Sequence, residues 1–212
     1  MIKEKLSAIL SSIPSDVTLV AVSKTKPIDR IEEAFESGQL DFGENKVQEM
    51  VDKAAVLSKN IRWHMIGHLQ RNKVKYIAPF VSLIHSVDSQ RLLNEIDKQG
   101  KKNGRVIDCL LQVRIAQEET KFGLTYEDCD ALLQQFDCTN VRIRGLMGMA
   151  SFTANQDQIE EEFKSLQQYY DQHQWQQQWD ILSMGMSGDY PLALRCGSNM
   201  IRIGSSIFGA RN

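Results

Sequence analysis

The stretch Leu19-Val20-Ala21-Val22-Ser23-Lys24-Thr25-Lys26-Pro27 contains an apolar run, a short polar turn and a proline, in that order. A short run that is apolar on both faces is typical of a buried parallel strand. Pro27 suits the first turn of a helix, and Ile28, Ile31 and Phe35 then recur at helical spacing. The stretch therefore predicts a β-strand, a turn and an α-helix, the repeating unit of an α/β protein.

The same order of elements recurs along the chain. Apolar runs that predict strands alternate with amphipathic segments that predict helices. The strand candidates are Leu19–Val22, Leu40–Phe42, Ile61–Ile66, Val81–Ser86, Val106–Val113, Val141–Met147, Ile181–Met184 and Met200–Ile203. Eight strands alternating with helices predict a closed (β/α)8 barrel of the TIM type, preceded by an amphipathic helix within Met1–Pro14. An open doubly wound sheet is the alternative, and it has less support because no GxGxxG follows the first strand.

Composition excludes several classes of protein. The chain has 212 residues, of which 42% are hydrophobic and 25% charged, as expected for one globular domain covering residues 1–212. A net charge of −2 lacks the basic excess of a nucleic-acid binder. No apolar run is long enough to span a membrane, and the charged first residues do not form a signal peptide. The four cysteines have neither CxxC nor zinc-site spacing, so we expect reduced thiols, no metal site, and a cytoplasmic monomer.

Polar segments follow the predicted strands. In a barrel the carboxyl ends of all strands meet at one face, where the βα loops build the functional site. The segments are Ser23-Lys24-Thr25, Gly43-Glu44-Asn45, Gly67-His68, Ser86-Val87-Asp88, Met147-Gly148-Met149, Ser187-Gly188-Asp189 and Gly204-Ser205-Ser206. The sequence therefore predicts a ligand site at this face.

Two features of this ring indicate the chemical class of the ligand. Lys24 and Lys26 lie on the same side of an extended segment, and either amine can form a Schiff base with an aldehyde. Gly204 and Ser205 follow the last strand and can hold a phosphate through backbone N–H groups. Ser187, at an expected helix start after the seventh strand, can add its hydroxyl. An aldehyde and a phosphate on one small molecule describe pyridoxal phosphate.

A series of ordered motifs also carries a resemblance to a known family. The motifs are Ala21-Val22-Ser23-Lys24-Thr25-Lys26-Pro27, Phe42-Gly43-Glu44-Asn45, Trp63-His64-Met65-Ile66-Gly67-His68-Leu69-Gln70-Arg71-Asn72-Lys73, Arg144-Gly145-Leu146-Met147, Ser183-Met184-Gly185-Met186-Ser187 and Arg202-Ile203-Gly204. Together they resemble the pyridoxal phosphate homeostasis protein family. The resemblance implies an alanine-racemase-like barrel that lacks the second, β domain of that enzyme. It also implies a protein that carries or buffers pyridoxal 5'-phosphate in the cell, without established catalysis.

The resemblance assigns roles to individual residues. It selects Lys24 over Lys26 as the lysine that carries the cofactor as a Schiff base. It pairs Arg202, which we expect to point inward from the last strand, with the pyridine nitrogen, and it places Asn45 by the ring or its phenolic oxygen. The expected cofactor-binding residues are Lys24, Asn45, Ser187, Arg202, Gly204 and Ser205. The implied partners are pyridoxal phosphate and apo forms of enzymes that use it.

Two other functions remain open on the sequence: an amino-acid racemase or lyase of the same fold, and a regulatory protein that signals cofactor status to partners. By resemblance to alanine racemases, a racemase needs a tyrosine on the face opposite the lysine, and only Tyr190 lies near a predicted mouth segment. We therefore expect no substantial racemase activity. His64 reads as a core histidine with a satisfied hydrogen bond, and Met147 and Met149 read as lining of the barrel.

Overall fold

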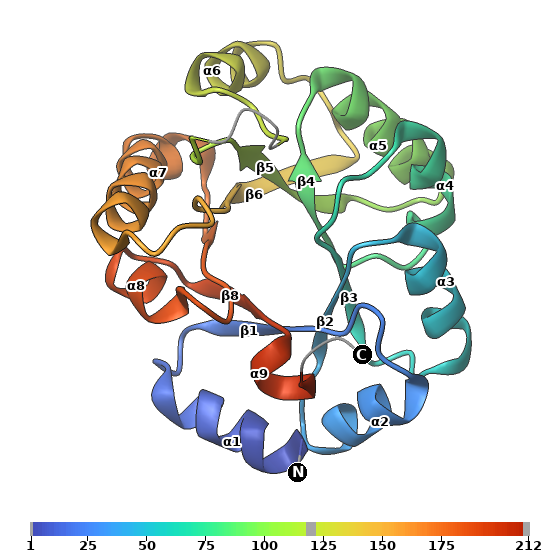
Figure 1. The fold of residues 1–212 in the computed structure, drawn as a ribbon. Helices are drawn as coiled ribbons and strands as arrows, with labels where there is room; N and C mark the ends of the chain where they lie inside the picture. The colour runs from blue at the N-terminus through green and yellow to red at the C-terminus, as the bar shows by residue number, and fades with distance from the viewer. Residues whose placement is uncertain (1, 118–121, 210–212) are drawn as a thin grey trace.

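The computed structural model, which describes residues 2–117 and 122–209, has a closed barrel of parallel strands at its centre (Figure 1). The strands are β1 (Thr18–Val22), β2 (Asp41–Glu44), β3 (Arg62–Met65), β4 (Leu83–Val87), β5 (Ile107–Val113), β6 (Val141–Gly148), β7 (Ile181–Ser183) and β8 (Met200–Ile203). Each strand pairs with the next in sequence, and β1 pairs with β8 to close the barrel. The predicted (β/α)8 barrel is confirmed, and every predicted apolar run overlaps one strand.

Helices surround the barrel on its outside (Figure 1). They are α1 (Ile2–Ser12), α2 (Ile28–Glu36), α3 (Val47–Val56), α4 (Val74–Ile77), α5 (Gln90–Lys102), α6 (Tyr126–Gln134), α7 (Gln156–Gln177), α8 (Tyr190–Arg195) and α9 (Ser205–Phe208), with a 3-10 turn η1 (Arg71–Lys73) before α4. The expected N-terminal helix is α1, whose buried residues Ile2, Leu6 and Ile9 face the molecule. Pro27 precedes α2 as predicted.

The apolar core has two layers. The larger layer fills the space between strands and helices, whereas a smaller cluster fills the interior of the barrel. The interior cluster consists of Val20, Leu83, Leu110, Met147, Ile181 and Met200, with Met149 packed against it. Met147 and Met149 are thus barrel lining, as expected. Because side chains fill the barrel, any ligand must bind above this layer, at the strand ends.

Gly145 in β6 explains one glycine of the sequence motifs. Its φ of +147° is disfavoured for residues with a side chain, and a Cβ atom there would overlap the carbonyl oxygen of Ile181 in β7. The close approach of β6 and β7 therefore depends on glycine at this position.

Two further observations bear on the class of protein. Within the described residues, no helix is both long and apolar enough to cross a membrane. The four cysteines are free thiols, as expected, and Cys109, Cys129 and Cys196 are buried.

Candidate functional site

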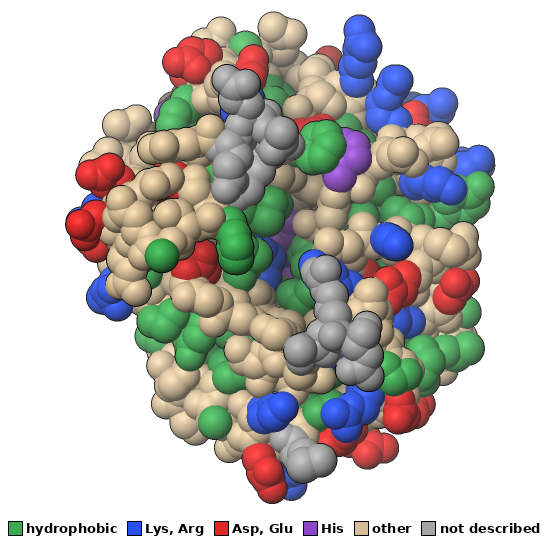
Figure 2. Space-filling view, in the orientation of Figure 1, with side chains coloured by type: hydrophobic (Ala, Val, Ile, Leu, Met, Phe, Trp, Pro, Cys, Tyr) green, Lys and Arg blue, Asp and Glu red, His purple; other side chains and the backbone are tan. Residues whose placement is uncertain are grey.

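A cavity of about 700 Å³ opens at the carboxyl ends of the strands. Figure 2 shows this face of the molecule, which is hollowed near its centre. The lining includes all of the predicted cofactor-binding residues: Lys24, Asn45, Ser187, Arg202, Gly204 and Ser205. Lys26, the alternative lysine, lines the same cavity. The loops thus bring together residues that are far apart in the sequence.

The lining is positively charged. Lys24, Lys26 and Arg202 contribute three cationic side chains, and the described lining contains no carboxylate. A concave site lined by charges of one sign attracts ligands of the opposite sign. The cavity therefore suits an anion.

The turn that carries Lys24 is fixed by hydrogen bonds to its neighbours. The Ser23 hydroxyl donates to Glu44 Oε1 at 2.6 Å, and the Thr25 N–H donates to Glu49 Oε1 at 2.5 Å. Thr25 has a left-handed φ of 61°, which a β-branched residue adopts only under local constraint. Lys26, one residue further, donates from Nζ to the Gly209 carbonyl oxygen at 3.1 Å.

A buried ion cluster lies behind this turn. Lys53 Nζ lies 2.7 Å from Glu44 Oε1 and 2.7 Å from Glu49 Oε1, and it donates to the Ser23 carbonyl oxygen at 2.8 Å. Lys53 is only 5% exposed and Glu44 is fully buried. Burial raises the pKa of Glu44, although the hydrogen bonds from Lys53 and Ser23 act in the opposite direction. Because the cluster touches the residues on both sides of Lys24, it determines the backbone path of the turn.

The loops after β7 and β8 meet at the other side of the cavity. The Gly204 N–H donates to the Ser187 hydroxyl oxygen at 3.4 Å, and Ser205 begins α9. The expectation of a helix start at Ser187 is wrong, because Asp189 precedes α8 and its carboxylate accepts from the Met186 N–H at 2.6 Å. This contact closes a turn that holds Ser187 ahead of the helix and beside Gly204.

Arg202 forms the floor of the cavity. It is 4% exposed, which confirms that it points inward from β8. Its guanidinium donates to the Ser183 hydroxyl and, at 3.1 Å, to the Gly148 carbonyl oxygen. Burial lowers the pKa of Arg202 to about 10, although the charge of Asp189 acts in the opposite direction. Since both hydrogen-bond partners are neutral, a bound anion or a lone pair is the natural counterpart of this cation.

The evolutionary relationships of the chain agree with this geometry. Residues 1–212 match the family described as alanine racemase, N-terminal domain. The pyridoxal phosphate homeostasis protein of Haemophilus influenzae is 38% identical over 203 residues, which cover 92% of this chain and 86% of that protein. The chain belongs to the pyridoxal phosphate homeostasis protein family. The Escherichia coli protein of the same name is 34% identical over 226 residues and covers 100% of this chain.

Solved structures support the membership. PipY of Synechococcus elongatus PCC7942, solved with PLP bound, superposes with a TM-score of 0.92 at 36% identity, covering 99% of this chain and 100% of that chain. An alanine racemase of Clostridium difficile 630 shares the fold alone, with a TM-score of 0.79 at 12% identity over 56% of its own chain. The resemblance to the pyridoxal phosphate homeostasis protein family that the motifs carry is confirmed.

The structure adds lining residues that the sequence left unassigned. Gln112 in β5 lines the cavity and donates to the Phe122 carbonyl oxygen at 3.1 Å. The Phe122 ring stacks on His68 with ring centroids 4.2 Å apart. A lone amide inside the apolar run Leu110–Val113 was the signal for Gln112. Gly67 comes so close to the preceding loop that a Cβ atom would overlap the Asn45 carbonyl oxygen, which explains a second motif glycine.

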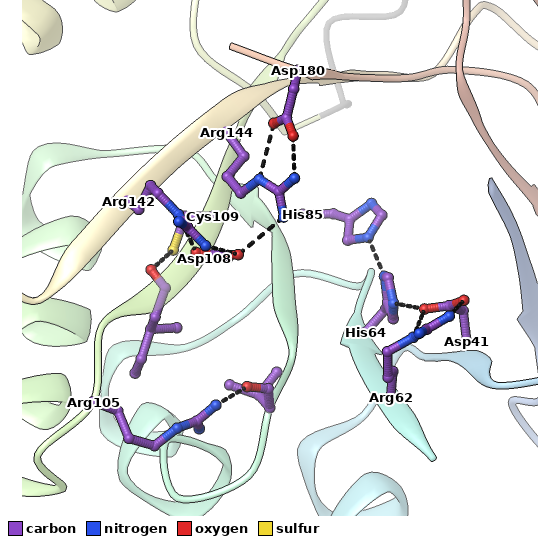
Figure 3. A network of polar contacts seen from close by, with 12 residues as sticks. Asp41, Arg62, His64, His85, Arg105, Asp108, Cys109, Arg142, Arg144 and Asp180 are labelled. Atoms are coloured by element: carbon purple, nitrogen blue, oxygen red, sulfur yellow. Dashed lines mark hydrogen bonds and ion pairs between the residues drawn. The ribbon is translucent and has the colours of Figure 1, made fainter. Parts of the chain in front are cut away.

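His64 lies in the barrel core and does not line the cavity. Its Nε2 lies 2.9 Å from Asp41 Oδ1 and its Nδ1 lies 2.9 Å from His85 Nε2 (Figure 3). The expected core histidine with a satisfied hydrogen bond is therefore confirmed. Asp41 also forms a bidentate ion pair with Arg62. Burial alone would raise the pKa of Asp41, but the hydrogen bonds from His64 and Arg62 outweigh it and lower the pKa to about 2.

The lowered pKa of Asp41 predicts a pH-dependent contribution to stability. A carboxyl group whose folded-state pKa is lowered stabilises the fold above its unfolded value, and this contribution disappears as the pH falls through the folded value. The shift from 3.8 to about 2 corresponds to roughly 2 kcal/mol. We expect Asp41→Asn to lower the free energy of unfolding by about this amount at neutral pH, as measured by urea titration. The difference from the wild type should shrink between about pH 4 and about pH 2; a difference that stays constant over this range would contradict the assignment.

Proposed function

We propose that this chain binds pyridoxal 5'-phosphate in the 700 Å³ cavity and carries or buffers the cofactor in the cell. The observation that carries the proposal is the cavity itself, which unites an amine, a buried guanidinium and a glycine-serine phosphate cradle without a carboxylate in its described lining. These groups match the aldehyde, the ring nitrogen and the phosphate of one small molecule. The PLP-bound structure of PipY, at 36% identity, supports the proposal.

Each polar residue of the cavity has an assigned role in this proposal. Lys24 holds the cofactor covalently at its aldehyde carbon, and Ser187, Gly204 and Ser205 bind the phosphate. Asn45 orients the ring or its phenolic oxygen. When bound, pyridoxal phosphate supplies a carbonyl carbon open to amines and a ring that accepts electrons.

Two features of the described cavity restrain catalysis: the position of Arg202 and the lack of a tyrosine that could act as a second base. A guanidinium keeps its proton, so Arg202 donates a hydrogen bond to the ring nitrogen and leaves that nitrogen unprotonated. An unprotonated ring accepts electrons poorly, which disfavours carbanion chemistry. Racemisation also needs a proton donor on the face opposite the lysine. The described lining contains no tyrosine, and Tyr190 belongs to the start of α8. Both features favour a carrier over a racemase.

The experiment that tests this function compares cofactor transfer with amino-acid turnover. The protein is loaded with pyridoxal phosphate, freed of excess cofactor, and mixed with an apo-enzyme whose activity reports the cofactor it receives. In parallel, alanine is incubated with the loaded protein in deuterium oxide. We expect enzyme activation and no exchange of the α-proton. Exchange that disappears in both Lys24→Ala and Tyr190→Phe would instead establish the racemase.

Ser187 supplies a quantitative test of the phosphate assignment. Ser187→Ala removes a hydrogen bond to a charged group, which costs about 1.5–3 kcal/mol, or roughly a tenfold or larger rise in Kd. The Kd for pyridoxal phosphate should rise by this factor, whereas the Kd for unphosphorylated pyridoxal should barely change. Ser206→Ala is the matched control, because Ser206 is exposed and is not part of the cavity lining. Equal losses for both ligands would remove Ser187 from the phosphate site.

A further inference from the structure

A chain of four hydrogen bonds crosses the interior of the barrel from the cavity floor to the opposite face. Arg202 Nη1 donates to Ser183 Oγ, and Ser183 Oγ lies 3.3 Å from His85 Nδ1. His85 Nε2 lies 2.9 Å from His64 Nδ1, and His64 Nε2 lies 2.9 Å from Asp41 Oδ1. Figure 3 shows the part from His85 to Asp41. The residues come from β8, β7, β4, β3 and β2, so the barrel alone brings them into line.

The two ends of this hydrogen-bond chain lie at different surfaces of the barrel. Arg202 lines the cavity at the carboxyl ends of the strands. Asp41 and His64 line a second, polar hollow at the amino ends of the strands, where Asp41 pairs with Arg62. The middle of this hydrogen-bond chain is enclosed by the protein, because Ser183 and His85 are fully buried. These two side chains must therefore find their partners inside the protein.

When both histidines are neutral, the chemistry of the two ends sets the direction of every hydrogen bond. A guanidinium can only donate, and an ionised carboxylate can only accept. His64 must then donate from Nε2 to Asp41 and accept at Nδ1, so His85 must donate from Nε2. His85 Nδ1 then accepts from the Ser183 hydroxyl, which leaves the Ser183 oxygen to accept from Arg202. All groups are satisfied when both histidines are neutral and carry their proton on Nε2.

The opposite direction is less favourable. It would require a proton on Nδ1 of both histidines, and therefore a cationic His64 if His64 still donated to Asp41. His85 would then donate to Ser183, whose own hydroxyl proton would lose its acceptor in the chain. A buried donor without a partner costs about 1–3 kcal/mol. Burial, reinforced by the positive charge of Arg202, also holds the pKa of His85 well below its ordinary value.

We propose that Ser183, His85 and His64 are positioning residues, which fix the Arg202 guanidinium beneath the cavity through a hydrogen-bond chain that runs in one direction from Arg202 to Asp41. The carboxylate at the far end polarises each bond in turn, so Ser183 becomes a stronger acceptor for the buried cation. The side chain of Arg202 is thereby aimed before any ligand arrives. The inference rests on the proposed function only for the identity of the ligand that Arg202 meets.

The direction of the chain can be read on the ligand-free protein. With ¹⁵N-labelled histidine, long-range ¹H–¹⁵N correlation spectra report which ring nitrogen carries a proton. We expect both His64 and His85 to carry it on Nε2 alone, with His64→Gln and His85→Gln identifying the signals. A proton on Nδ1 of either ring would overturn the proposed direction. Because no cofactor is present, this result is independent of the proposed function.

The positioning role requires a ligand-binding test with a built-in rescue. His85→Leu cannot bond to Ser183, whereas the amide of His85→Gln can accept from Ser183 and donate to His64. We expect His85→Leu to raise the Kd for pyridoxal phosphate about tenfold, as for a lost hydrogen bond to a charged group, and His85→Gln to restore most of the affinity. An analogue in which CH replaces the ring nitrogen should lose much less affinity in His85→Leu.

The remaining outcomes separate the two hypotheses. Ser183→Ala removes the same link with little change in core volume, so it replaces His85→Leu if that variant fails to fold. Equal losses for pyridoxal phosphate and the CH analogue, or equal affinities of the Leu and Gln variants, would overturn the positioning role. If the wild type bound no pyridoxal phosphate, the proposed function would fail. The histidine tautomers would still show whether the hydrogen-bond chain runs in the proposed direction.

Discussion

Lys24→Ala should abolish the covalent attachment of pyridoxal phosphate, whereas Lys26→Ala should retain most of it. Both lysines line the cavity, but the Lys26 amine donates to the Gly209 carbonyl oxygen at 3.1 Å. Lys24 extends from a turn whose neighbours, Ser23 and Thr25, are each bonded to a glutamate of β2 or α3. The turn thus presents the Lys24 amine reproducibly, which favours covalent attachment over a mobile lysine.

The measurement is the visible absorbance of the loaded protein before and after borohydride reduction, followed by peptide mapping. In the wild type, the reduced cofactor should lie on the peptide that contains Lys24. The absorbance of the lysine-bound cofactor should be missing in Lys24→Ala and present in Lys26→Ala. Label found on Lys26 of the wild-type protein would show that the assignment to Lys24 is wrong.

Lys53→Met should be the most destabilising of the substitutions considered. Lys53 neutralises the fully buried Glu44 and binds Glu49, so its removal leaves an uncompensated charge in the core. Breaking a buried ion pair in this way costs about 3–5 kcal/mol. Unfolding by urea should show this loss, and Lys98→Met, on the exposed face of α5, should change stability little.

A double variant distinguishes charge from packing in this cluster. Glu44→Gln combined with Lys53→Met removes both charges, so it should recover part of the stability that Lys53→Met loses. The single variant should also weaken pyridoxal phosphate binding, because the cluster holds the turn around Lys24. A loss below about 1 kcal/mol in Lys53→Met would mean that the cluster behaves like a surface ion pair.

Most of the barrel and the position of its site can be predicted from the sequence, because both follow from local patterns. Alternating apolar runs and helical stripes define the strands, and barrel topology then carries every strand end to one face. Lys24, Asn45 and Arg202 could therefore be placed together without knowledge of any contact. The extent of the domain, the oligomeric state and the cellular location remain predictions.

What the sequence could not reveal depends on register between strands. Asp41 pairs with Arg62 and Gly43 with His64 in the β2–β3 ladder, and only this alignment lets His64 reach Asp41 and His85. The Glu44–Lys53 pair likewise depends on how α3 sits on β2. The helix start assigned to Ser187 failed for a local reason, since the Asp189 carboxylate bonds to the Met186 N–H and delays α8.

The cationic cavity has a consequence for the lifetime of the protein. Three like charges without a carboxylate in the described lining repel one another when no anion is bound. A ligand that binds only the folded state adds RT ln(1 + [L]/Kd) to its stability, or about 2.7 kcal/mol at a hundredfold excess over Kd. Protease resistance, and with it abundance, should then rise and fall with cofactor supply. The amount of folded protein would thus report how much cofactor is available.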